Sequence, residues 1–541
     1  MKNQTYLADV IIAGGGLAGI VTAYEIIDKS NKKVLLIEKG PREKFGGLAK
    51  ESFGGIHLID TPHQRRMGIR DNPELAYRDW ESFAKFGTED ELPRKWAKFY
   101  CENSLEYIYK FLDHKKIKFL PIVNWPERGM YLPGNSVPRW HITWGTGYEI
   151  IFRLLNALDS HKNRKNLEIL FDHEVSNIEI ENEKAVGVTG IVLTRDEPYI
   201  AKAPHIVVAS GGICGGDLSK VRENWNSSWG APPKILLNGS HDFADGLLHD
   251  KIRNIGGNVT HLDKQWHYAA GVNHPAKRRP FDGLSLVPPR SALWMNAIGE
   301  RIGPVPLVGY SDTKFLVESI LNQPGKYSWQ ILNRKIALKE LAVSGGDYMK
   351  AFRFKSKLML LKHLIFGNKE LLERLISECP DDFVVAKTLP ELVEKMNTKG
   401  LEGHQVNFDI IKQAISDYDD QIDRGEAYHN DDQLRRIANF RTNKGDRIRI
   451  CKFQKILDPS AGPLIAIREF ILSRKSLGGI QTDLTCRALK KDGSPIAGIY
   501  AVGEAAGFGG GGIHGQGSLE GTFLGACVLS GRIAGKFIAL E

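Results

Sequence analysis

The segment ADVIIAGGGLAG at residues 8–19 decides the fold. Its apolar half has the pattern of a short buried strand, and glycines follow at positions 14, 16 and 19. The chain continues with IVTAYEIIDKS at 20–30, a helical pattern, and then with a second apolar run that ends at Glu38. Strand, glycine turn, helix and strand in this order are typical of a unit that binds a dinucleotide. We therefore predict a βαβ unit with a nucleotide at its glycine turn.

The residues of this motif have separate tasks. Gly14 permits a tight turn, Gly16 lets the backbone approach a pyrophosphate, and Gly19 lets the helix pack closely on the strand. Glu38 would accept hydrogen bonds from a ribose diol, and its charge disfavours a 2′-phosphate on that ribose. The motif therefore favours an adenosine dinucleotide without the extra phosphate, and a purely structural glycine turn is the alternative.

Two further glycine pairs follow within ten residues, in GGLA at 46–49 and in SFGG at 52–55. Glycine pairs let backbone amides reach a planar or anionic ligand without interference from side chains. A nicotinamide cofactor would not need them. They favour FAD as the cofactor.

The remaining glycine clusters repeat the same logic of strand, glycine turn and helix. One is HIVVASGG at 205–212, and the other is GIYAVGEAAG at 498–507, followed by FGGGGIHGQGSLEGTFLG at 508–525. Of the 541 residues 56 are glycine, about one in ten, against roughly 7% in average proteins. Because the excess gathers at these few places, we expect one folded site to bring the clusters together.

The middle of the chain has a different pattern. Helical stretches are predicted at 315–321, 331–341, 354–376 and 389–396, with few glycine pairs. We predict an α/β fold: a Rossmann-like FAD-binding domain in two sequence segments, 1–288 and 458–541, with an inserted α+β cap domain at 289–457.

Charge gives little indication of a partner. Lys and Arg exceed Asp and Glu by 73 − 64 = 9, and both signs are mixed along most of the chain, which argues against a nucleic-acid-binding protein. The exception is 350–369, with six basic residues, no acidic residue and interleaved apolar ones. This pattern indicates a basic amphipathic helix, either a surface helix packed on the core or one that contacts a membrane surface.

The six cysteines are scattered, without a CxxC pair or a Cys/His spacing typical of zinc, so we expect reduced thiols and no metal. The apolar run at 10–24 follows Asp9 and is rich in glycine, unlike a signal peptide, and at 15 residues it is too short to span a bilayer. We expect a cytoplasmic protein.

The order and spacing of GGGLAG, Glu38, GGLAKESFGG, VVASGG, LGGIQTD and GIYAVGEAAG resemble the fumarate reductase and 3-ketosteroid dehydrogenase superfamily of FAD enzymes, over nearly the whole chain. Segments such as TPHQRRMGIRD, GNSVPRWHITWGTG and KQWHYAAG are most similar to a bacterial group named only FAD-binding dehydrogenases. The resemblance implies FAD and the fold. It does not imply a substrate.

The resemblance also implies which residues bind the cofactor. The ADP part would lie on Gly14, Gly16, Leu17, Ala18, Gly19, Glu38 and Lys39, with Val175 at the adenine. The flavin part would lie near Gly46, Gly47, Leu48, Ala49, Ser52, Gly54 and Gly55; Ala209, Gly211 and Glu504 would border the cofactor, and the backbone of Thr522, Phe523 and Leu524 would close over the ring. A helix N-terminus there stabilises an anionic reduced flavin. Covalently flavinylated relatives have a histidine where this chain has Leu48, so we expect non-covalent FAD.

The sequence departs from the family at the substrate residues. Fumarate reductases have a substrate-binding His at the position of Lys475, an Arg at that of Ser518 and a proton-delivering Glu at that of Val305. These differences argue against dicarboxylate reduction. The ketosteroid dehydrogenase tyrosine that polarises the 3-keto group is replaced by Ile513, whereas Gly517 keeps the amide that acts with it.

Flavin dehydrogenation needs a base for the proton and a donor for the developing negative charge. Among the candidates, His514 is favoured because it lies in the glycine loop that faces the flavin. The others are Arg139, His141, His267, Tyr268, Lys475 and the amide of Gly517. Each histidine has a purely structural role as its alternative, and Tyr131, Tyr310 and Asp312 are interpreted as structural.

Taken together, these features predict an FAD-dependent oxidoreductase that exchanges a hydride between flavin N5 and a C–C bond next to a carbonyl. Its substrate would be hydrophobic or carbonyl-bearing, and an unidentified electron acceptor or donor would complete the cycle. The alternatives are a flavin monooxygenase, an amine-oxidase-type enzyme and a non-catalytic membrane-associated flavoprotein.

Overall fold

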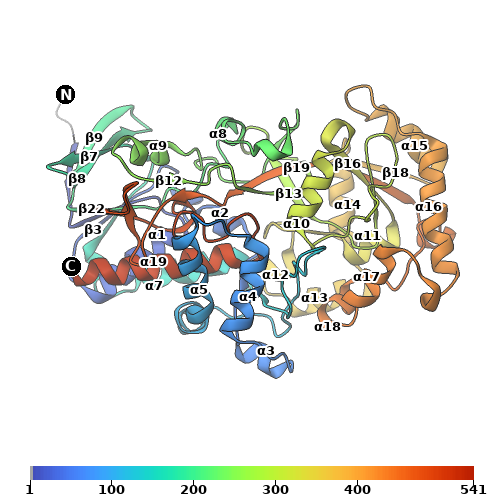
Figure 1. The fold of residues 1–541 in the computed structure, drawn as a ribbon, viewed down its shortest axis with the longest axis horizontal. Helices are drawn as coiled ribbons and strands as arrows, with labels where there is room; N and C mark the ends of the chain where they lie inside the picture. The colour runs from blue at the N-terminus through green and yellow to red at the C-terminus, as the bar shows by residue number, and fades with distance from the viewer. Residues whose placement is uncertain (1–3) are drawn as a thin grey trace.

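The computed structural model describes residues 4–541. Two β-sheets follow one another along the long axis of the molecule, and helices cover both of them (Figure 1). The first sheet holds the N-terminal segment and the last strand of the chain, and the second holds the middle of the chain. The first sheet therefore combines segments from both ends of the chain.

The parallel strands at the centre of the first sheet confirm the predicted βαβ unit. β2 (Val10–Ala13) leads into α1 (Leu17–Lys29) and β3 (Val34–Ile37), and all residues of both strands are buried. The two strands pair in parallel, as do β3 and β6 (Leu167–Leu170). Strands buried on both faces are expected to be continuously apolar, as these are.

Strands from distant parts of the chain complete this sheet. β10 (His205–Val208) pairs in parallel with β2 on one side and with β22 (Pro495–Ala501) on the other. The sheet is extended by β1 (Gln4–Leu7), β7 (His173–Glu181), β8 (Lys184–Val192), β9 (Glu197–Lys202) and β21 (Arg487–Leu489). The FAD-binding fold is therefore discontinuous in sequence, as predicted.

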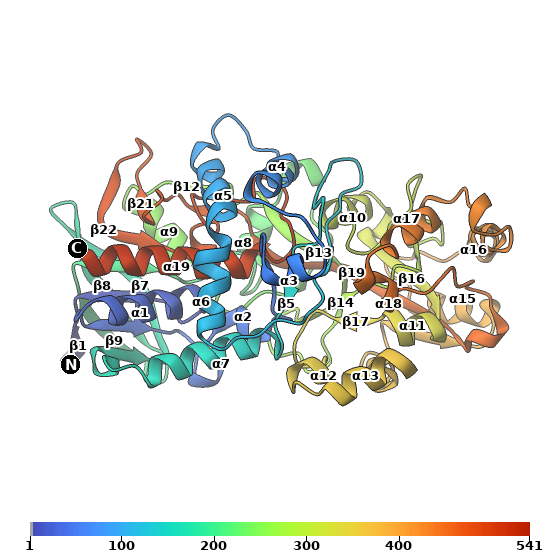
Figure 2. The same ribbon diagram turned by 90° about the horizontal axis from the view of Figure 1, so that it is seen from below.

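The C-terminal helix α19 (Thr522–Leu540) lies alongside α1 (Figure 2). Two glycines allow the close contact: a Cβ on Gly531 would come 2.6 Å from the carbonyl oxygen of Ala18, and one on Gly535 would come 2.6 Å from Cβ of Glu25. Arg532 then pairs with Glu25 at 2.6 Å. The last helix thus covers the first βαβ unit.

The second sheet reaches beyond the predicted cap domain. Its central strand β19 (Leu464–Ser476) pairs with β13 (Gln265–Asn273) and β16 (Tyr327–Asn333), and β14 (Gly283–Val287) adds to β13. The sheet also contains β11 (Leu237–Asn238), β15 (Leu293–Met295), β17 (Ala342–Val343) and β18 (Phe383–Ala386). β13, β14 and β19 lie outside 289–457, so the second sheet includes strands from both sides of the predicted cap domain, whose boundaries stay a prediction.

The predicted helices of the middle region are confirmed in part. α10 (Thr313–Leu321) and α15 (Leu389–Thr398) lie where expected. Residues 331–333 instead end the buried strand β16, and α11 (Arg334–Glu340) begins only at an Asn333 cap. The stretch 354–376 is divided between α13 (Lys357–Phe366) and α14 (Lys369–Glu378), because Gly367 has a φ of +79° and ends α13.

The other helices cover the two sheets. In the first part of the chain they are α2 (Gly47–Glu51), α3 (Pro62–Arg66), α4 (Pro73–Ala84), α5 (Glu91–Asn103), α6 (Phe111–His114), α7 (Thr146–Asp159), α8 (Ser219–Glu223) and α9 (Leu247–Asn254). In the second they are α12 (Lys350–Arg353), α16 (Phe408–Asp423), α17 (Asp432–Phe440) and α18 (Lys444–Arg449). Short strands β4 (Gly55–His57) and β5 (Trp140–Ile142) form a separate pair.

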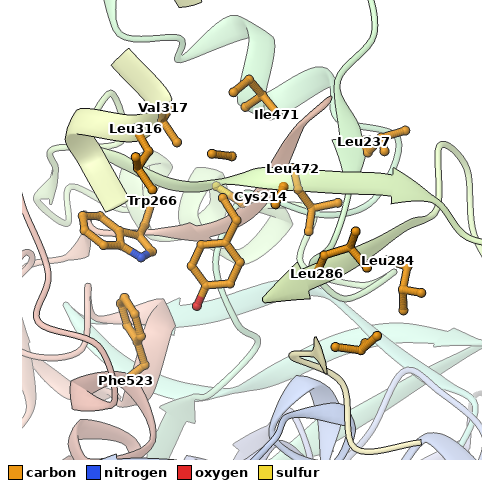
Figure 3. Packing of buried hydrophobic residues seen from close by; sticks show 14 of the residues in the cluster. Cys214, Leu237, Trp266, Leu284, Leu286, Leu316, Val317, Ile471, Leu472 and Phe523 are labelled. Carbon is orange, nitrogen blue, oxygen red and sulfur yellow. The ribbon is translucent and has the colours of Figure 1, made fainter. Parts of the chain in front are cut away.

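A continuous apolar core joins the two sheets. Figure 3 shows Leu472 of β19 among apolar side chains of neighbouring elements, with Trp266 of β13 facing Phe523 at the start of α19. The two ring centroids lie 6.5 Å apart. This contact holds the N-terminus of α19 against the second sheet.

α19 is the one helix within residues 4–541 that is long and apolar enough to cross a membrane, with a mean hydropathy of 1.5. The protein itself buries 56% of that apolar window. Its contact with α1 accounts for the apolar composition as that of a core helix.

Candidate active site

A cavity of about 460 Å³ begins at the carboxyl ends of the parallel strands and continues to the second sheet. Ala13 and Ile37 at the ends of β2 and β3, Ala209 after β10 and Val502 after β22 all line it. The carboxyl edge of a doubly wound sheet is where ligands bind in such folds. Every cofactor residue predicted from the sequence lines this cavity, except Gly19 and Thr522.

The glycines of the cavity leave space that only a ligand would fill. A Cβ on Gly16 would meet no atom within 4 Å, one on Gly47 only Cα of Gly16 at 3.4 Å, and one on Gly211 only Cβ of Ala244 at 3.7 Å. The missing side chains thus face the cavity, where backbone amides are accessible. This cradle, at the N-termini of α1 and α2, suits the pyrophosphate of FAD.

Two glycines of the first motif, Gly14 and Gly19, pack closely against neighbouring backbone. A Cβ on Gly14 would lie 2.3 Å from the carbonyl oxygen of Ala209, and one on Gly19 would lie 2.1 Å from that of Gly14. Gly14 lines the cavity. Gly19 does not, and its missing side chain allows α1 to pack closely against the glycine turn. Its contribution to cofactor binding is to position Gly14 and Gly16.

Glu38 is tied to the glycine turn by both carboxylate oxygens. One oxygen accepts a hydrogen bond from the backbone N–H of Gly15 at 2.7 Å, and the other from that of Gly40 at 2.7 Å. Burial raises the pKa of Glu38, and the two N–H donors oppose that rise. Glu38 therefore holds the turn in place as well as offering its charge to a ribose.

Ion pairs close the end of the cavity at which the sequence predicts the adenine. Lys39 pairs with Glu174 at 2.7 Å and with Asp245 at 2.8 Å, and Val175 lies beside Glu174 in β7. These contacts join three segments that are far apart in the chain. They fix the width of the cavity at this end.

α19 begins at the opposite end of the cofactor region. Its N-cap, Gly521, has a φ of +93°, and a Cβ there would come 2.6 Å from Trp140 and 2.7 Å from the backbone nitrogen of His57. Phe523 and Leu524 line the cavity, whereas Thr522 turns away and donates its hydroxyl to the carbonyl of Leu519 at 2.7 Å. The N-terminus of a 19-residue helix is thus directed at the cavity.

A buried carboxyl group and a buried amine lie in this part of the cavity. Glu504 accepts a hydrogen bond from the backbone N–H of Ser476 at 2.9 Å, and burial raises its pKa to about 7. Burial lowers the pKa of Lys475 to about 8, against the attraction of Glu520 and Glu504. Both groups therefore change charge near neutral pH.

Tyr268, Glu520 and Lys475 form a polar cluster in the wall of the cavity. The Tyr268 hydroxyl lies 3.0 Å from each carboxylate oxygen of Glu520, and Nζ of Lys475 lies 3.4 Å from the same hydroxyl. Burial and the charge of Glu520 raise the pKa of Tyr268 well above its ordinary value. Tyr268 is therefore a neutral phenol that donates to a carboxylate, with an amine beside it.

Arg474 and Tyr310 also line the cavity, and neither was predicted as a site residue. In β19, Lys475 pairs with Trp266 and Ser473 pairs with His267, so Arg474 occupies a β-bulge. A bulge breaks the strict alternation of side chains across a strand, which explains why both Arg474 and Lys475 face the cavity. Tyr310 was interpreted as structural, but its side chain lines the cavity, and burial raises its pKa.

The structure does not bring His514 and Gly517 to the cavity wall. The His514 ring stacks on Trp80 with centroids 5.6 Å apart, and its Nε2 shares a hydrogen bond with the Thr522 hydroxyl at 2.8 Å. The backbone N–H of Gly517 donates to the carbonyl of His514 at 3.1 Å. Burial lowers the pKa of His514 well below its ordinary value, so this residue supports the loop as a neutral ring.

Arg139, His141 and His267 are likewise buried away from the cavity. Arg139 pairs with Asp71 at 2.9 Å and with Asp79 at 2.6 Å. His141 donates from Nδ1 to the carbonyl of Arg139 at 2.8 Å, and His267 bonds to the side-chain oxygen of Gln265 at 3.1 Å. Each of these residues has structural partners and is absent from the cavity lining among the described residues, so a catalytic role for them stays a prediction that this arrangement does not favour.

Comparison with known proteins supports the same cofactor. Residues 9–524 match the family described as FAD binding domain. A KsdD-like steroid dehydrogenase of Mycobacterium tuberculosis is 39% identical over 98% of this chain and 95% of its own length.

Solved structures show the fold. A 3-ketosteroid-Δ4-(5α)-dehydrogenase from Rhodococcus jostii is similar with a TM-score of 0.64 and 18% identity, over 100% of both chains. An open flavocytochrome c3 fumarate reductase is similar with a TM-score of 0.68 and 20% identity, over 99% of this chain and 78% of that one. The chain belongs to the FAD binding domain family and is an FAD-dependent oxidoreductase, with the discontinuous α/β fold and the cofactor that its glycine clusters predict.

Proposed function

We propose that this oxidoreductase removes hydrogen from a C–C bond next to a carbonyl group in a hydrophobic, steroid-like substrate. The observation that carries this proposal is the hydrogen-bonded pair of Tyr268 and Glu520 in the same cavity as the FAD cradle. Around the pair the wall is largely apolar and includes Val287, Leu341 and Met349. A relative 39% identical is named a steroid dehydrogenase, which supports this substrate class.

Tyr268 would take the proton from the substrate carbon while its own hydroxyl proton passes to Glu520. Such a relay keeps the tyrosine neutral overall, which its raised pKa favours. FAD held in the glycine cradle would supply the hydride acceptor for the neighbouring carbon. One proton and one hydride leave the substrate, and a C=C bond forms between the two carbons.

Lys475 and Arg474 would stabilise the negative charge that develops on the carbonyl oxygen. Both cationic side chains line the cavity, and Nζ of Lys475 lies 3.4 Å from the Tyr268 hydroxyl. A positive charge fixed in a buried site stabilises a developing oxyanion more strongly than it would in water. The Arg474 guanidinium also donates to the backbone carbonyl of Gly239, which holds this side chain in place at the cavity wall.

We further propose that FAD is held without a covalent bond. Leu48 lines the cavity at the position where covalently flavinylated relatives carry histidine, and its hydrocarbon side chain forms no bond to a flavin. The contacts that remain are backbone amides, the N-termini of α1 and α19, and the ion-paired adenine end.

An anaerobic titration tests the proposed reaction. The purified flavoprotein is mixed with a panel of 3-ketosteroids, including 4-androstene-3,17-dione, and the flavin absorbance is followed. We expect one or more members to bleach the flavin and gain a C=C bond by mass. Rapid bleaching by NADPH, with release of peroxide once oxygen is admitted, and no bleaching by any ketone would instead support a monooxygenase-type enzyme.

A further inference from the structure

The helix α13 presents large apolar side chains to the solvent. No residue of this helix is buried, and the exposed fractions of Leu358, Ile365 and Phe366 are 80%, 63% and 72%. Phe354, Leu361 and Leu364 add to the same surface, which we call the α13 face. A helix that packs on the core hides such a stripe, so the α13 face needs a partner outside the protein.

Positive charge surrounds the α13 face. The segment 350–369 contains six basic and no acidic residues. Among the described residues, Lys357, Lys362 and Lys369 have no ion-pair partner. Apolar side chains with free lysines at their margin are typical of helices that lie in the interface of an anionic lipid bilayer.

The segment is held firmly at both ends. Before α13, the Arg353 guanidinium stacks 3.2 Å from the centroid of the Tyr148 ring, and Lys355 pairs with Glu149 of α7 at 2.9 Å. After α13, the backbone N–H of Asn368 donates to the carbonyl of Leu338 at 2.9 Å. The exposed apolar surface is therefore a fixed part of the fold, and it lies at the edge of the molecule (Figure 2).

The inner side of the same helix closes the cavity. Leu360 and His363 of α13 line it, together with Met349 and with Phe352 of α12, and Leu364 at the margin of the α13 face reaches it as well. The helix therefore lies between the solvent and the cavity.

We propose that the α13 face docks on an anionic lipid bilayer, so that hydrophobic substrate passes from the bilayer to the cavity behind this helix. The passage of substrate rests on the proposed function, whereas the docking does not. A second copy of this chain is a poorer partner, because two α13 faces would bring six unpaired lysines together. A bilayer that carries phosphatidylserine supplies the opposite charge.

Vesicle sedimentation tests the docking with the complete flavoprotein and no substrate. We expect the protein to sediment with vesicles in which about one lipid in three is phosphatidylserine, and to remain in solution with phosphatidylcholine alone. The combined variant Leu358→Ser, Leu361→Ser and Ile365→Ser should bind at least about tenfold more weakly. Its matched control, Leu7→Ser, Leu193→Ser and Leu484→Ser, changes exposed leucines elsewhere and should bind like the wild type.

A charge variant gives an independent measurement. Lys357→Gln, Lys362→Gln and Lys369→Gln should weaken binding to anionic vesicles, whereas Lys162→Gln, Lys165→Gln and Lys202→Gln lose the same charge away from α13 and should not. Absorbance of bound flavin shows that each variant is folded. The docking proposal fails if the wild type does not bind anionic vesicles, if both sets of variants bind equally, or if the leucine variant dissociates a dimer in sedimentation.

A failure of the proposed steroid reaction can be distinguished from a failure of docking. Vesicle binding could then persist while no ketosteroid bleaches the flavin. If instead the steroid reaction occurs at equal rates for wild type and α13 variants, with substrate supplied in vesicles, the passage through α13 is wrong and the active-site assignment stands.

Discussion

The hydroxyl of Tyr268 lies 3.0 Å from both carboxylate oxygens of Glu520, although 252 residues separate them in the chain. This pair predicts a specific loss of activity. Tyr268→Phe removes the proton acceptor and should slow flavin reduction by roughly 10²–10⁴-fold while FAD stays bound. Stopped-flow absorbance measures the rate, and Tyr131→Phe, whose ring is exposed, is the control. An unchanged rate in Tyr268→Phe would exclude the relay.

The charge of Lys475 should control the pH dependence of the reaction. Burial lowers its pKa from 10.5 to about 8, so the ammonium that faces Tyr268 and Glu520 is lost as the pH rises through about 8. We expect the rate of flavin reduction to fall above that pH. In Lys475→Arg the charge persists and the fall should move to higher pH, whereas in Lys475→Met the break should vanish.

The lowered pKa of Lys475 also affects stability: the rate should fall with rising pH, but the free energy of unfolding should rise. Between pH of about 8 and about 10.4 the unfolded chain binds a proton at Lys475 that the folded chain lacks. The free energy of unfolding should therefore increase with pH across this window relative to Lys475→Met. Urea unfolding at several pH values measures the difference, and a decrease would contradict the assignment.

Gly16 should matter for the cofactor and not for the fold. Its φ is −74°, which any residue can adopt, and a Cβ would point into empty space. Gly16→Ala should therefore leave the melting temperature of the apoprotein unchanged but weaken FAD binding about tenfold or more. Gly345→Ala is the matched control, because its Cβ would meet ordinary contacts at 3.7 Å outside the cavity. Equal affinity in both variants would argue against a pyrophosphate at this turn.

Arg139 should prove to be structural. Its side chain is fully buried between Asp71 and Asp79, so Arg139→Met leaves two carboxylates without their partner. The loss of a partner from a buried ion pair costs about 3–5 kcal/mol. We expect a large drop in the unfolding midpoint but unchanged turnover per bound flavin. A loss of turnover with normal stability would restore the predicted catalytic role.

Denaturation checks the state of the cofactor. Because Leu48 forms no bond to the flavin, precipitation with acid should leave all the yellow colour in the supernatant, with the mass of FAD. Colour in the pellet would show a covalent link through another residue.

The cofactor half of the site could be predicted from the sequence because each of its parts is local. A buried strand, a glycine turn and a helix N-terminus follow one another within about 12 residues. The sequence alone therefore predicts that the glycines of GGGLAG and GGLA lie at turns between a strand and a helix. The helix predicted at 331–333 was wrong because a short apolar run is compatible with either a helix or a strand. Pairing with β19, which is distant in sequence, makes these residues part of a strand.

The substrate half depends on contacts between distant segments. His514 is surrounded by glycines in sequence, but Trp80 from α4 stacks on it and removes it from the cavity. Glu520 gains its role only because Tyr268 of β13 reaches it, and Arg474 faces the cavity only because of a bulge against β13. No pattern within one segment reveals these relationships, although the adjacent charged residues Arg474 and Lys475 near the end of a largely buried strand are a signal in the sequence.

The contact between α1 and α19 has a consequence for how the enzyme is made. The first βαβ unit leaves the ribosome early, but the face of α1 that packs against Gly531 and Gly535 gains its cover only when the last residues of the chain are synthesised. Phe523, which lines the cavity, belongs to the same late segment. A chain that ends before α19 would lack both the cover of α1 and part of the cavity wall, so we expect it to retain FAD poorly.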